Sequence, residues 1–322
     1  MQNRRMLVAS LAFAAAFGNF ARASAQVFPS HPITMIVPLS AGGPIDTIAR
    51  IVAEGMRASL GQSVVIENVT GASGSLGVGR VARAAPDGYT LSLGYLGTHV
   101  FNGATYKLSY DLLNDFEPVA LLVTNPLLII AKKAVPAKNL QELVAWLKAN
   151  PGKASQGTTG VGSSSHVAGI YFQRETGTSF QFVPYRGAAP MMQDLLGGQI
   201  DLMFDFAADA LPQIRFGTIK AYAVTAPNRL PAAPDIPTVD EAGLPGFYIS
   251  AWEGIWVPKG TPKDIIGKLN TAVVAALADP SVRRQLTELG QEIFPRDQQT
   301  PEALGALQRA EIKKWWPILK AE

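Results

Sequence analysis

The chain has 322 residues, with 28 lysines and arginines, 25 aspartates and glutamates, and no cysteine. This length is enough for two domains of ordinary size, each burying a core of its own. The lack of cysteine excludes disulfides, thiol catalysis, thiolate metal sites and a lipid-anchored cysteine.

The first 25 residues have the composition of an export signal. Arg4 and Arg5 form a charged start, an apolar run follows from Met6 to Phe17, and Ala23-Ser24-Ala25 is a small-residue cleavage site. The apolar run is too short to cross a bilayer as a helix. We therefore expect cleavage near Ala25, with ordinary secretion favoured over the twin-arginine route.

Removal of this segment balances the charge of the chain. Residues 1–25 hold three arginines and no acid, so 28 basic residues fall to 25, against 25 acidic ones. A chain without a basic surplus gives no electrostatic reason to expect nucleic acid or a membrane surface as a partner. No later segment has the length of a membrane span, so a soluble mature protein is expected.

Apolar runs alternate with helix-like segments in the first part of the chain. We predict strands at Ile33–Val37, Val64–Ile66 and Thr90–Leu93, and a helix over Ile45–Leu60 that ends at Gly61. Strand, helix and strand in units of about thirty residues predict a parallel sheet with right-handed crossovers.

A proline divides the next apolar stretch. Val119–Val123 and Leu127–Ala131 are strand-like runs separated by Asn125-Pro126. Because proline lacks the N–H that a strand donates, we expect a broken strand here, where the chain crosses from one lobe to another.

The remaining segments predict the rest of two α/β lobes. Asn139-Leu140-Gln141-Glu142 is a capping-box start of a helix, and the proline-rich stretch Pro227–Pro237 is a candidate for the return crossing. Lobe 1 is predicted to contain residues 26–123 and 226–322, and lobe 2 residues 124–225. Further strands are predicted at Phe180–Pro184, Ile200–Phe204, Ile219–Thr225 and Ile249–Val257, and further helices after Thr261-Pro262 and Thr300-Pro301.

The loop around Gly42-Gly43 lies between a predicted strand and the start of a predicted helix. Such a position exposes backbone N–H groups to an anion. Gly43 is followed by Pro44-Ile45-Asp46 rather than Gly-Lys-Ser/Thr, and Gly160-Val161-Gly162 lacks the third glycine of a dinucleotide fingerprint. A small carboxylate is therefore favoured over a nucleotide, and the alternative is a plain turn capped by Asp46.

A second loop of this kind lies in the other half of the chain. Ser163, Ser164 and Ser165 precede His166 and the helical segment Val167–Glu175, so three hydroxyls stand at a helix start. They can donate to an oxyanion, or one serine can cap the helix while the others are solvated. Two such loops in separate halves predict two jaws around one anion.

Other polar residues follow predicted strands. Asp205 lies at the carboxyl end of one strand, where open α/β sheets place ligands, and Tyr185-Arg186-Gly187 follows another. Asp205 can bind a ligand N–H or O–H group or cap the next segment. Arg186 can pair with an anion or with the other lobe.

An exported serine hydrolase is the alternative of a different class. It would use Ser164 or Ser165 with His166, but no G-x-S-x-G elbow surrounds them, and the chain has only three histidines, the others being His31 and His99. No set of His, Asp and Glu residues has zinc-ligand spacing, so we expect no metal and no cofactor.

Taken in order, these segments resemble the extracytoplasmic solute receptors of tripartite tricarboxylate transporters, the Bug receptor family. The resemblance covers nearly all of the mature chain. It depends on segments Pro32–Arg50, Ala85–Leu91, Gly162–His166, Val183–Gly187, Asp194–Asp205, Pro234–Val239, Glu241–Phe247 and Pro258–Pro262.

The resemblance implies two α/β lobes, joined by two crossing segments, that close on a ligand in the manner of a type II periplasmic binding protein. Such receptors commonly hold a carboxylate through backbone amides and bridging waters. The residues implied are Ala41, Gly42, Gly43, Asp46, Thr47, Tyr95 and Thr98 on lobe 1, and Ser163, Ser164, Ser165, His166, Tyr185 and Asp205 on lobe 2.

The chain departs from the family pattern at Val69–Gly74 and at Arg186, where lysine is common, so the ligand of a relative does not transfer directly. The function implied is capture of a di- or tricarboxylate or an aromatic acid in the periplasm, without catalysis. The partners implied are transporter membrane subunits or a sensor encoded elsewhere, and we expect a monomer. A ligand-sensing domain of a regulator is disfavoured by the export signal and by the lack of a helix-turn-helix.

Overall fold

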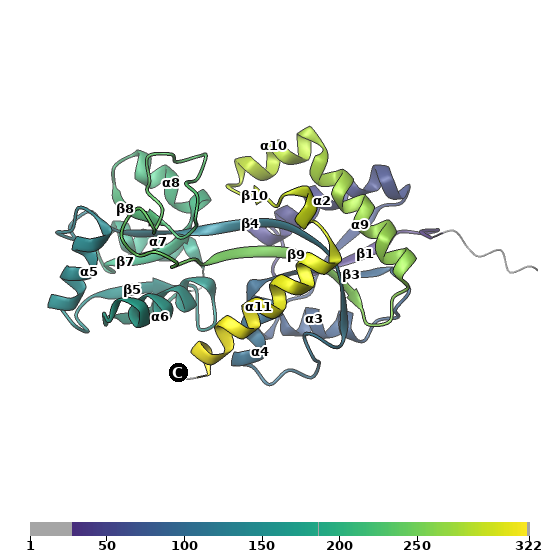
Figure 1. Ribbon diagram of the computed structural model, residues 1–322, viewed down its shortest axis with the longest axis horizontal. Coiled ribbons are helices and arrows are strands. Elements are labelled where there is room, and N and C mark those ends of the chain that lie inside the picture. Colours follow the sequence, from purple (N-terminus) through teal and green to yellow (C-terminus); the bar gives the residue numbers. More distant parts are fainter. Residues whose placement is uncertain (1–27, 186, 321–322) are drawn as a thin grey trace, which may run out of the picture.

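The structure, a computed structural model, describes residues 28–185 and 187–320, so the predicted export signal lies outside the described residues. Figure 1 shows two α/β lobes joined by two long strands, β4 (Phe116–Lys132) and β9 (Ser250–Pro258). This arrangement confirms the predicted two-lobed α/β fold with two crossing segments.

One ten-stranded sheet runs through both lobes in the order β2-β1-β3-β9-β4-β7-β5-β6, with β8 and β10 also pairing with β4. Strand β4 pairs with β9 through Pro126 and Ser250, and with β7 from Leu127 onward. The other strands are β1 (Ile33–Val37), β2 (Val64–Asn68), β3 (Thr90–Tyr95), β5 (Ser155–Thr158), β6 (Gln181–Pro184), β7 (Leu202–Phe206), β8 (Ile219–Val224) and β10 (Glu292–Ile293).

The first lobe forms around the parallel strands β1, β2 and β3. Helix α2 (Pro44–Leu60) buries an apolar stripe that includes Ile48, Val52 and Met56, which recur at the spacing of one helix face. The stripe packs with Leu269 and Val273 of α9 (Lys263–Ala278) in one buried cluster. The predicted strands and the predicted first helix are therefore confirmed in this lobe.

The second lobe repeats the plan with β5, β6 and β7, which are also parallel. Its helices are α5 (Leu140–Ala149), α6 (Ser164–Thr176), α7 (Ala188–Leu196) and α8 (Ala207–Arg215). The predicted capping box is present at the start of α5, because Asn139 Oδ1 accepts from Glu142 N–H at 2.8 Å and Glu142 Oε2 accepts from Lys138 N–H at 2.8 Å.

Helix α11 (Pro301–Leu319) crosses obliquely below the two joining strands in Figure 1 and ends beside the second lobe. Trp315 is fully buried and meets Phe101 of the first lobe and Tyr171 of the second lobe edge to face, at centroid distances of 5.7 and 5.2 Å. This tryptophan therefore packs the last helix against both lobes. The remaining helices are η1 (Ala72–Gly74), α3 (Ser75–Ala82), η2 (Gly97–Phe101), α4 (Asn102–Thr105), α10 (Pro280–Glu288) and η3 (Arg296–Gln298).

Two expectations about the crossings are wrong. Strand β4 runs unbroken through Pro126, because this proline lies where β4 changes partners: β10 ends its pairing at Thr124, and β7 begins at Leu127. On the side of β4 away from β9, no described strand pairs with Pro126, so the N–H that proline lacks is not needed for hydrogen bonds to a second neighbouring strand.

The segment Pro227–Pro237 is not the return crossing. It stays on the second lobe, where Leu230 and Ile236 pack in the cluster that also holds β7 residues, and β9 makes the crossing instead. We propose that the second lobe extends to residue 249 rather than to residue 225. The helix predicted after Thr261-Pro262 is α9, with Pro262 as its N-cap.

Within residues 28–185 and 187–320, no single helix is long and apolar enough to span a membrane, although the pair α9 and α10, bent by 72°, meets that test by length and composition.

Candidate functional site

The predicted ligand loops follow the carboxyl ends of parallel strands in both lobes. In the first lobe, the loops after β1, β2 and β3 lie against one another. A Cβ added to Gly74 would stand 2.7 Å from Thr98 Cγ2 and 3.1 Å from Pro38 Cβ. Asn102 Nδ2 also donates to the carbonyl of Ser73 at 2.9 Å. The structure therefore brings the first-lobe candidates to one edge of the sheet, as expected for parallel strands.

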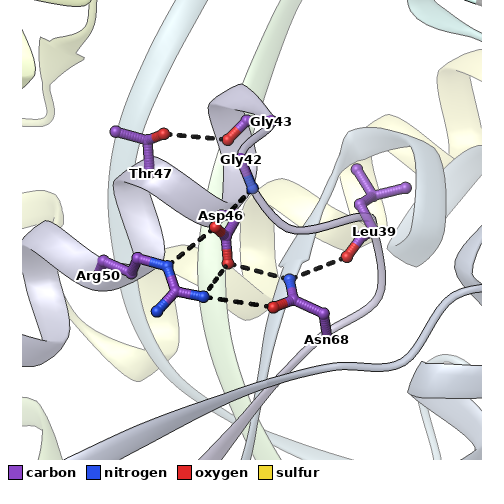
Figure 2. A network of polar contacts seen from close by, with 7 residues as sticks. All are labelled: Leu39, Gly42, Gly43, Asp46, Thr47, Arg50 and Asn68. Carbon is purple, nitrogen blue, oxygen red and sulfur yellow. Dashed lines mark hydrogen bonds and ion pairs between the residues drawn. The ribbon is translucent and has the colours of Figure 1, made fainter.

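Asp46 orders the first loop (Figure 2). Its side chain is 3% exposed and accepts hydrogen bonds from the backbone N–H of Gly42 at 2.8 Å, from Arg50 Nε at 2.9 Å and from Asn68 Nδ2 at 2.9 Å. Asn68 Nδ2 donates in addition to the carbonyl of Leu39 at 3.0 Å. The carboxylate thus ties the start of α2 to the end of β2.

The charge of Asp46 is fixed by these contacts. Hydrogen bonds from Arg50 first, and from Gly42 and Asn68, outweigh the effect of burial and lower the pKa of Asp46 to about 2. The N–H of Gly42 is consequently not free for a ligand. Among the described residues, no partner is found for the backbone N–H groups of Gly43, Ile45 and Asp46, so these remain as donors at the helix start.

Thr47 turns back toward its own helix, since Thr47 Oγ1 donates to the carbonyl of Gly43 at 3.1 Å (Figure 2). Ala41 precedes the turn and is exposed. Neither side chain is held toward the second lobe by a hydrogen bond that the structure describes.

The second loop is ordered by hydroxyl groups. Ser163 caps α6, because its Oγ accepts the N–H of His166 at 3.2 Å. Ser165 is buried, accepts the N–H of Thr159 at 3.0 Å, and lies 3.0 Å from Ser163 Oγ. His166 Nδ1 accepts the N–H of Gly162 at 3.3 Å, so its proton is on Nε2 when the ring is neutral.

The serine hydroxyls therefore have the arrangement of a capped helix start. Ser165 Oγ contacts Thr159 and Ser163, and His166 Nδ1 accepts its hydrogen bond from the backbone N–H of Gly162. Of the described residues, no group of three or more His, Asp and Glu side chains could hold a metal ion.

The second loop approaches the first lobe directly. Gly162 adopts φ +78°, a conformation that favours glycine, and a Cβ built on it would lie 3.6 Å from Oγ1 of Thr105 at the end of α4. The second loop therefore lies close to the end of α4 in the opposite lobe.

Tyr95 ends β3, and Thr98 follows it in η2. Thr98 is fully buried, its Oγ1 accepts the N–H of Tyr95 at 3.2 Å, and it lies 3.0 Å from Nδ1 of His99. Burial raises the pKa of Tyr95 to about 12 and lowers that of His99 to about 3. His99 stacks on Trp256 at a centroid distance of 3.9 Å, so it is a neutral packing residue.

Tyr185 and Asp205 occupy the second-lobe edge with different environments. Tyr185 Oη donates to Asp194 at 2.7 Å, which directs the phenol toward α7. Asp205 is 3% exposed, with Oδ1 accepting the N–H of Phe206 at 3.0 Å, and Oδ2 has no partner among the described residues. Burial, assisted by the nearby Asp209, raises the pKa of Asp205 to about 8, so at neutral pH its carboxyl group is largely protonated.

Sequence reasoning missed three polar residues at this site. Asn68 joins the Asp46 network through a contact across 22 residues that no local pattern reveals. Arg50 follows Asp46 by four residues on the same helix, a spacing that could have indicated the ion pair. Glu253 lies buried on β9, directly opposite Tyr95 of β3. A single acid in the apolar run Ile249–Val257 was the available signal for it.

Two α/β lobes joined by two strands, with a helix start presented from each lobe, define a solute-binding protein of the periplasmic type. The family model described as "Tripartite tricarboxylate transporter family receptor" matches residues 48–322. The chain belongs to this family.

Curated relatives cover most of the chain. Protein BugT of Bordetella pertussis is 33% identical over 322 residues, which cover 99% of this chain and 98% of the relative. An Agrobacterium vitis protein, named for its position between ttuE and ttuC' in TAR-I, is 42% identical over 287 residues, covering 89% of this chain and 83% of its own.

Solved structures of the same type superpose well. The periplasmic binding protein BugD is 42% identical with a TM-score of 0.78, covering 91% of this chain and 98% of its own. MatC from Rhodopseudomonas palustris, solved with bound malate, is 41% identical with a TM-score of 0.79, covering 91% and 100%. A second R. palustris protein, solved with adipate, is 34% identical with a TM-score of 0.79, covering 91% and 97%.

Proposed function

We propose that this receptor captures a small carboxylate between its lobes, with the starts of α2 and α6 as the two anion-binding jaws. The observation that carries this proposal is that each lobe presents a helix start with free N–H donors, and that the second-lobe loop approaches the first lobe, 3.6 Å from a Cβ on Gly162 to Oγ1 of Thr105. The N-terminus of a helix favours negative charge through its exposed N–H groups and its dipole. The bound malate and adipate of the two R. palustris structures support the same ligand class.

This geometry needs no buried arginine to reach a useful affinity. Micromolar binding requires about 8 kcal/mol, which several charge-assisted N–H donors and an apolar wall can supply. Tyr95, Phe206 and Trp252 lie on the strands beside the loops, and these rings can flank an aromatic acid as well as a di- or tricarboxylate. The site residues proposed here are the ones that the family resemblance implies.

Titration calorimetry against mono-, di-, tri- and aromatic carboxylates tests this proposal. We expect at least one panel member to bind with a dissociation constant in the micromolar range and to raise the melting temperature. No heat and no thermal shift with any member would contradict it. Native mass spectrometry of the purified protein, searching for a co-purified acid, would identify the natural ligand.

We further propose that the receptor is exported and acts without catalysis. Cleavage near Ala25 would release it to the periplasm as a monomer, where transporter membrane subunits or a sensor recognise the closed form. The mass of the mature protein tests the cleavage site. We expect no ester hydrolysis, and an esterase activity lost in either Ser164→Ala or Ser165→Ala would instead support the hydrolase alternative.

A further inference from the structure

The two joining strands carry buried polar atoms without partners. Glu253 on β9 is 2% exposed, and its Oε2 has no hydrogen bond to any described residue. Asn125 on β4 is 5% exposed, and its Oδ1 also lacks a partner among the described residues. An unsatisfied buried oxygen costs about 1–3 kcal/mol, so two of them on adjacent strands require an explanation.

These two side chains are close neighbours on the sheet. Glu253 lies directly opposite Val123 of β4, and Asn125 lies directly opposite Ala251. Directly opposite residues share a face, so Glu253 and Asn125 are diagonal neighbours on one face, at a Cα spacing of about 7–8 Å. The free oxygens therefore belong to one place, where the sheet passes between the lobes.

This place adjoins the predicted ligand loops. Glu253 is paired with Tyr95, whose N–H donates to Thr98 at 3.2 Å. Thr98 in turn packs on Gly74 beside Pro38, which begins the loop that leads to Gly42 and Gly43. One row of contacts thus connects the acceptor oxygens to the first jaw.

We propose that Glu253 and Asn125 form an acceptor pair for a hydroxyl or ammonium group of the ligand, so that the receptor selects hydroxy or amino carboxylates over unsubstituted ones. This inference rests on the proposed function, in which the helix starts hold the carboxylate. The jaws supply N–H donors, whereas the joining strands supply acceptors, and a ligand with both kinds of group satisfies both sets. A ligand that lacks the hydroxyl or ammonium group leaves these buried acceptors unpaired, and this cost discriminates strongly between similar ligands.

A ligand ammonium group and a ligand hydroxyl group would have different effects on the ionisation of Glu253. Burial raises its pKa to about 8, so the carboxyl group is mostly protonated at neutral pH. The titratable group directly opposite it is Tyr95 on β3, whose pKa is raised to about 12. Glu292 lies two strands away, on β10 beyond β4, and its pKa is raised by burial. A bound ammonium would ionise Glu253 and release its proton, whereas a hydroxyl would leave the proton in place.

Matched ligands test the selection. Succinate, malate and aspartate share one carbon skeleton and differ in a hydrogen, a hydroxyl or an ammonium group; glutarate, 2-hydroxyglutarate and glutamate repeat the series, and benzoate and salicylate give an aromatic pair. We expect the substituted member of a series to bind at least tenfold more tightly than its parent. Equal affinities in every series that binds would overturn the inference and leave the proposed function standing. If no carboxylate binds, both fail.

Variants assign the preference to the acceptor pair. Glu253→Gln keeps the shape and one acceptor oxygen but removes the acid, and we expect it to reduce a tenfold preference for an ammonium ligand to less than threefold while leaving the parent acid bound. Glu253→Met fills the same volume with an apolar chain, and we expect a higher melting temperature together with loss of the preference for hydroxyl and ammonium ligands alike. The control is Ser92→Ala, which removes another buried, unpartnered oxygen from β3. An unchanged preference in both Glu253 variants would show that the oxygens bind only water.

Calorimetry in two buffers of different ionisation enthalpy separates the hydroxyl from the ammonium. An ammonium ligand should show a buffer-dependent enthalpy that corresponds to proton release and disappears in Glu253→Gln. A hydroxyl ligand should show none. A proton release that persists unchanged in Glu253→Gln would overturn the assignment of the proton to Glu253.

Discussion

The two jaws solve the same structural problem with different chemistry. Each must hold a turn between a strand and a helix while leaving backbone N–H groups free. In the first lobe a charged network does this: Asp46 takes the N–H of Gly42, and Arg50 balances its charge (Figure 2). In the second lobe the groups are neutral, with Ser163 as the cap and Ser165 buried inside the loop.

Because of this difference, the groups that order the loop carry charge near the ligand in the first lobe but not in the second lobe. An ionised Asp46 near an anionic ligand would repel it, but Arg50 and Asn68 also contact that carboxylate. The α6 start carries no acid in its first turn and needs no such compensation. The first jaw is therefore expected to respond to charge changes, and the second to the loss of single hydroxyls.

The largest effect is expected for Gly43→Val. Gly43 has φ −80° and ψ 169°, which any residue adopts, and an added Cβ would meet only the carbonyl oxygen of Ser40, at 3.5 Å. The fold should accept valine while its side chain covers the donors, so affinity should fall more than 100-fold, about 2.7 kcal/mol. Calorimetry and thermal melts measure both quantities, and an unchanged affinity would show that this loop is only a turn.

The second jaw provides the contrasting glycine variant. Gly162→Ala should lower stability by about 1 kcal/mol, because φ +78° is unfavourable for a residue with a Cβ. If Gly43→Val destabilised the protein as much as Gly162→Ala does, its loss of binding could not be assigned to blocked donors.

A smaller effect is expected for Asp46→Asn, which keeps the size of the side chain and removes its charge. We expect about tenfold weaker binding, near 1.4 kcal/mol, since the turn at Gly42 loses a charged acceptor. The folded pKa of about 2 lies below the ordinary 3.8, so the contribution of Asp46 to stability is present above that value and is lost as pH falls toward 2.

Denaturant unfolding between pH 4 and pH 2 measures how much of the stability depends on the charge of Asp46. The wild type should lose more stability between pH 4 and pH 2 than Asp46→Asn does. Parallel losses in the two proteins would show that the ion pair contributes nothing, a common result for exposed pairs. Ser163→Ala is the neutral control and should leave this pH dependence intact.

Ser163→Ala itself should destabilise the protein by about 1 kcal/mol, the usual cost of removing an N-cap hydroxyl. The reason is that the N–H of His166 loses its acceptor at 3.2 Å. Ser164→Ala is the matched variant, because Ser164 lies inside the helix and is not its cap. Equal stability of Ser163→Ala and Ser164→Ala in thermal melts would contradict the capping role.

The sequence predicted well the elements that are determined by residues close together in the chain. Apolar periodicity located β1, β2, β3 and α2, and the Asn139 capping box located α5. It also indicated that two glycine-containing loops stand at helix starts, which the structure places at sheet edges of opposite lobes. These features depend on residues within one or two turns of each other.

Features that depend on distant partners could not be predicted in the same way. Pro126 interrupts no strand because β4 changes neighbours there, and that is a property of the whole sheet. The late crossing at β9 depends on Leu230 and Ile236 finding the second-lobe core. The burial of Glu253 depends on β3 and β4 flanking it, so one acid in an apolar run was the sole local sign.

The smallest effect is expected for Arg50→Gln, which separates the charge balance of the first jaw from its geometry. The Arg50 side chain is 53% exposed, so solvent screens its pair with Asp46, and Gly42 and Asn68 still hold the carboxylate after the substitution. We expect no more than a twofold loss of affinity at physiological salt, and a larger loss at low salt, where the uncompensated Asp46 repels the anion. Calorimetry at two ionic strengths measures this, with Arg57→Gln at the far end of α2 as the control. A tenfold loss at both ionic strengths would mean that Arg50 contacts the ligand, and the first jaw would then hold its anion with a cation as well as with backbone N–H groups.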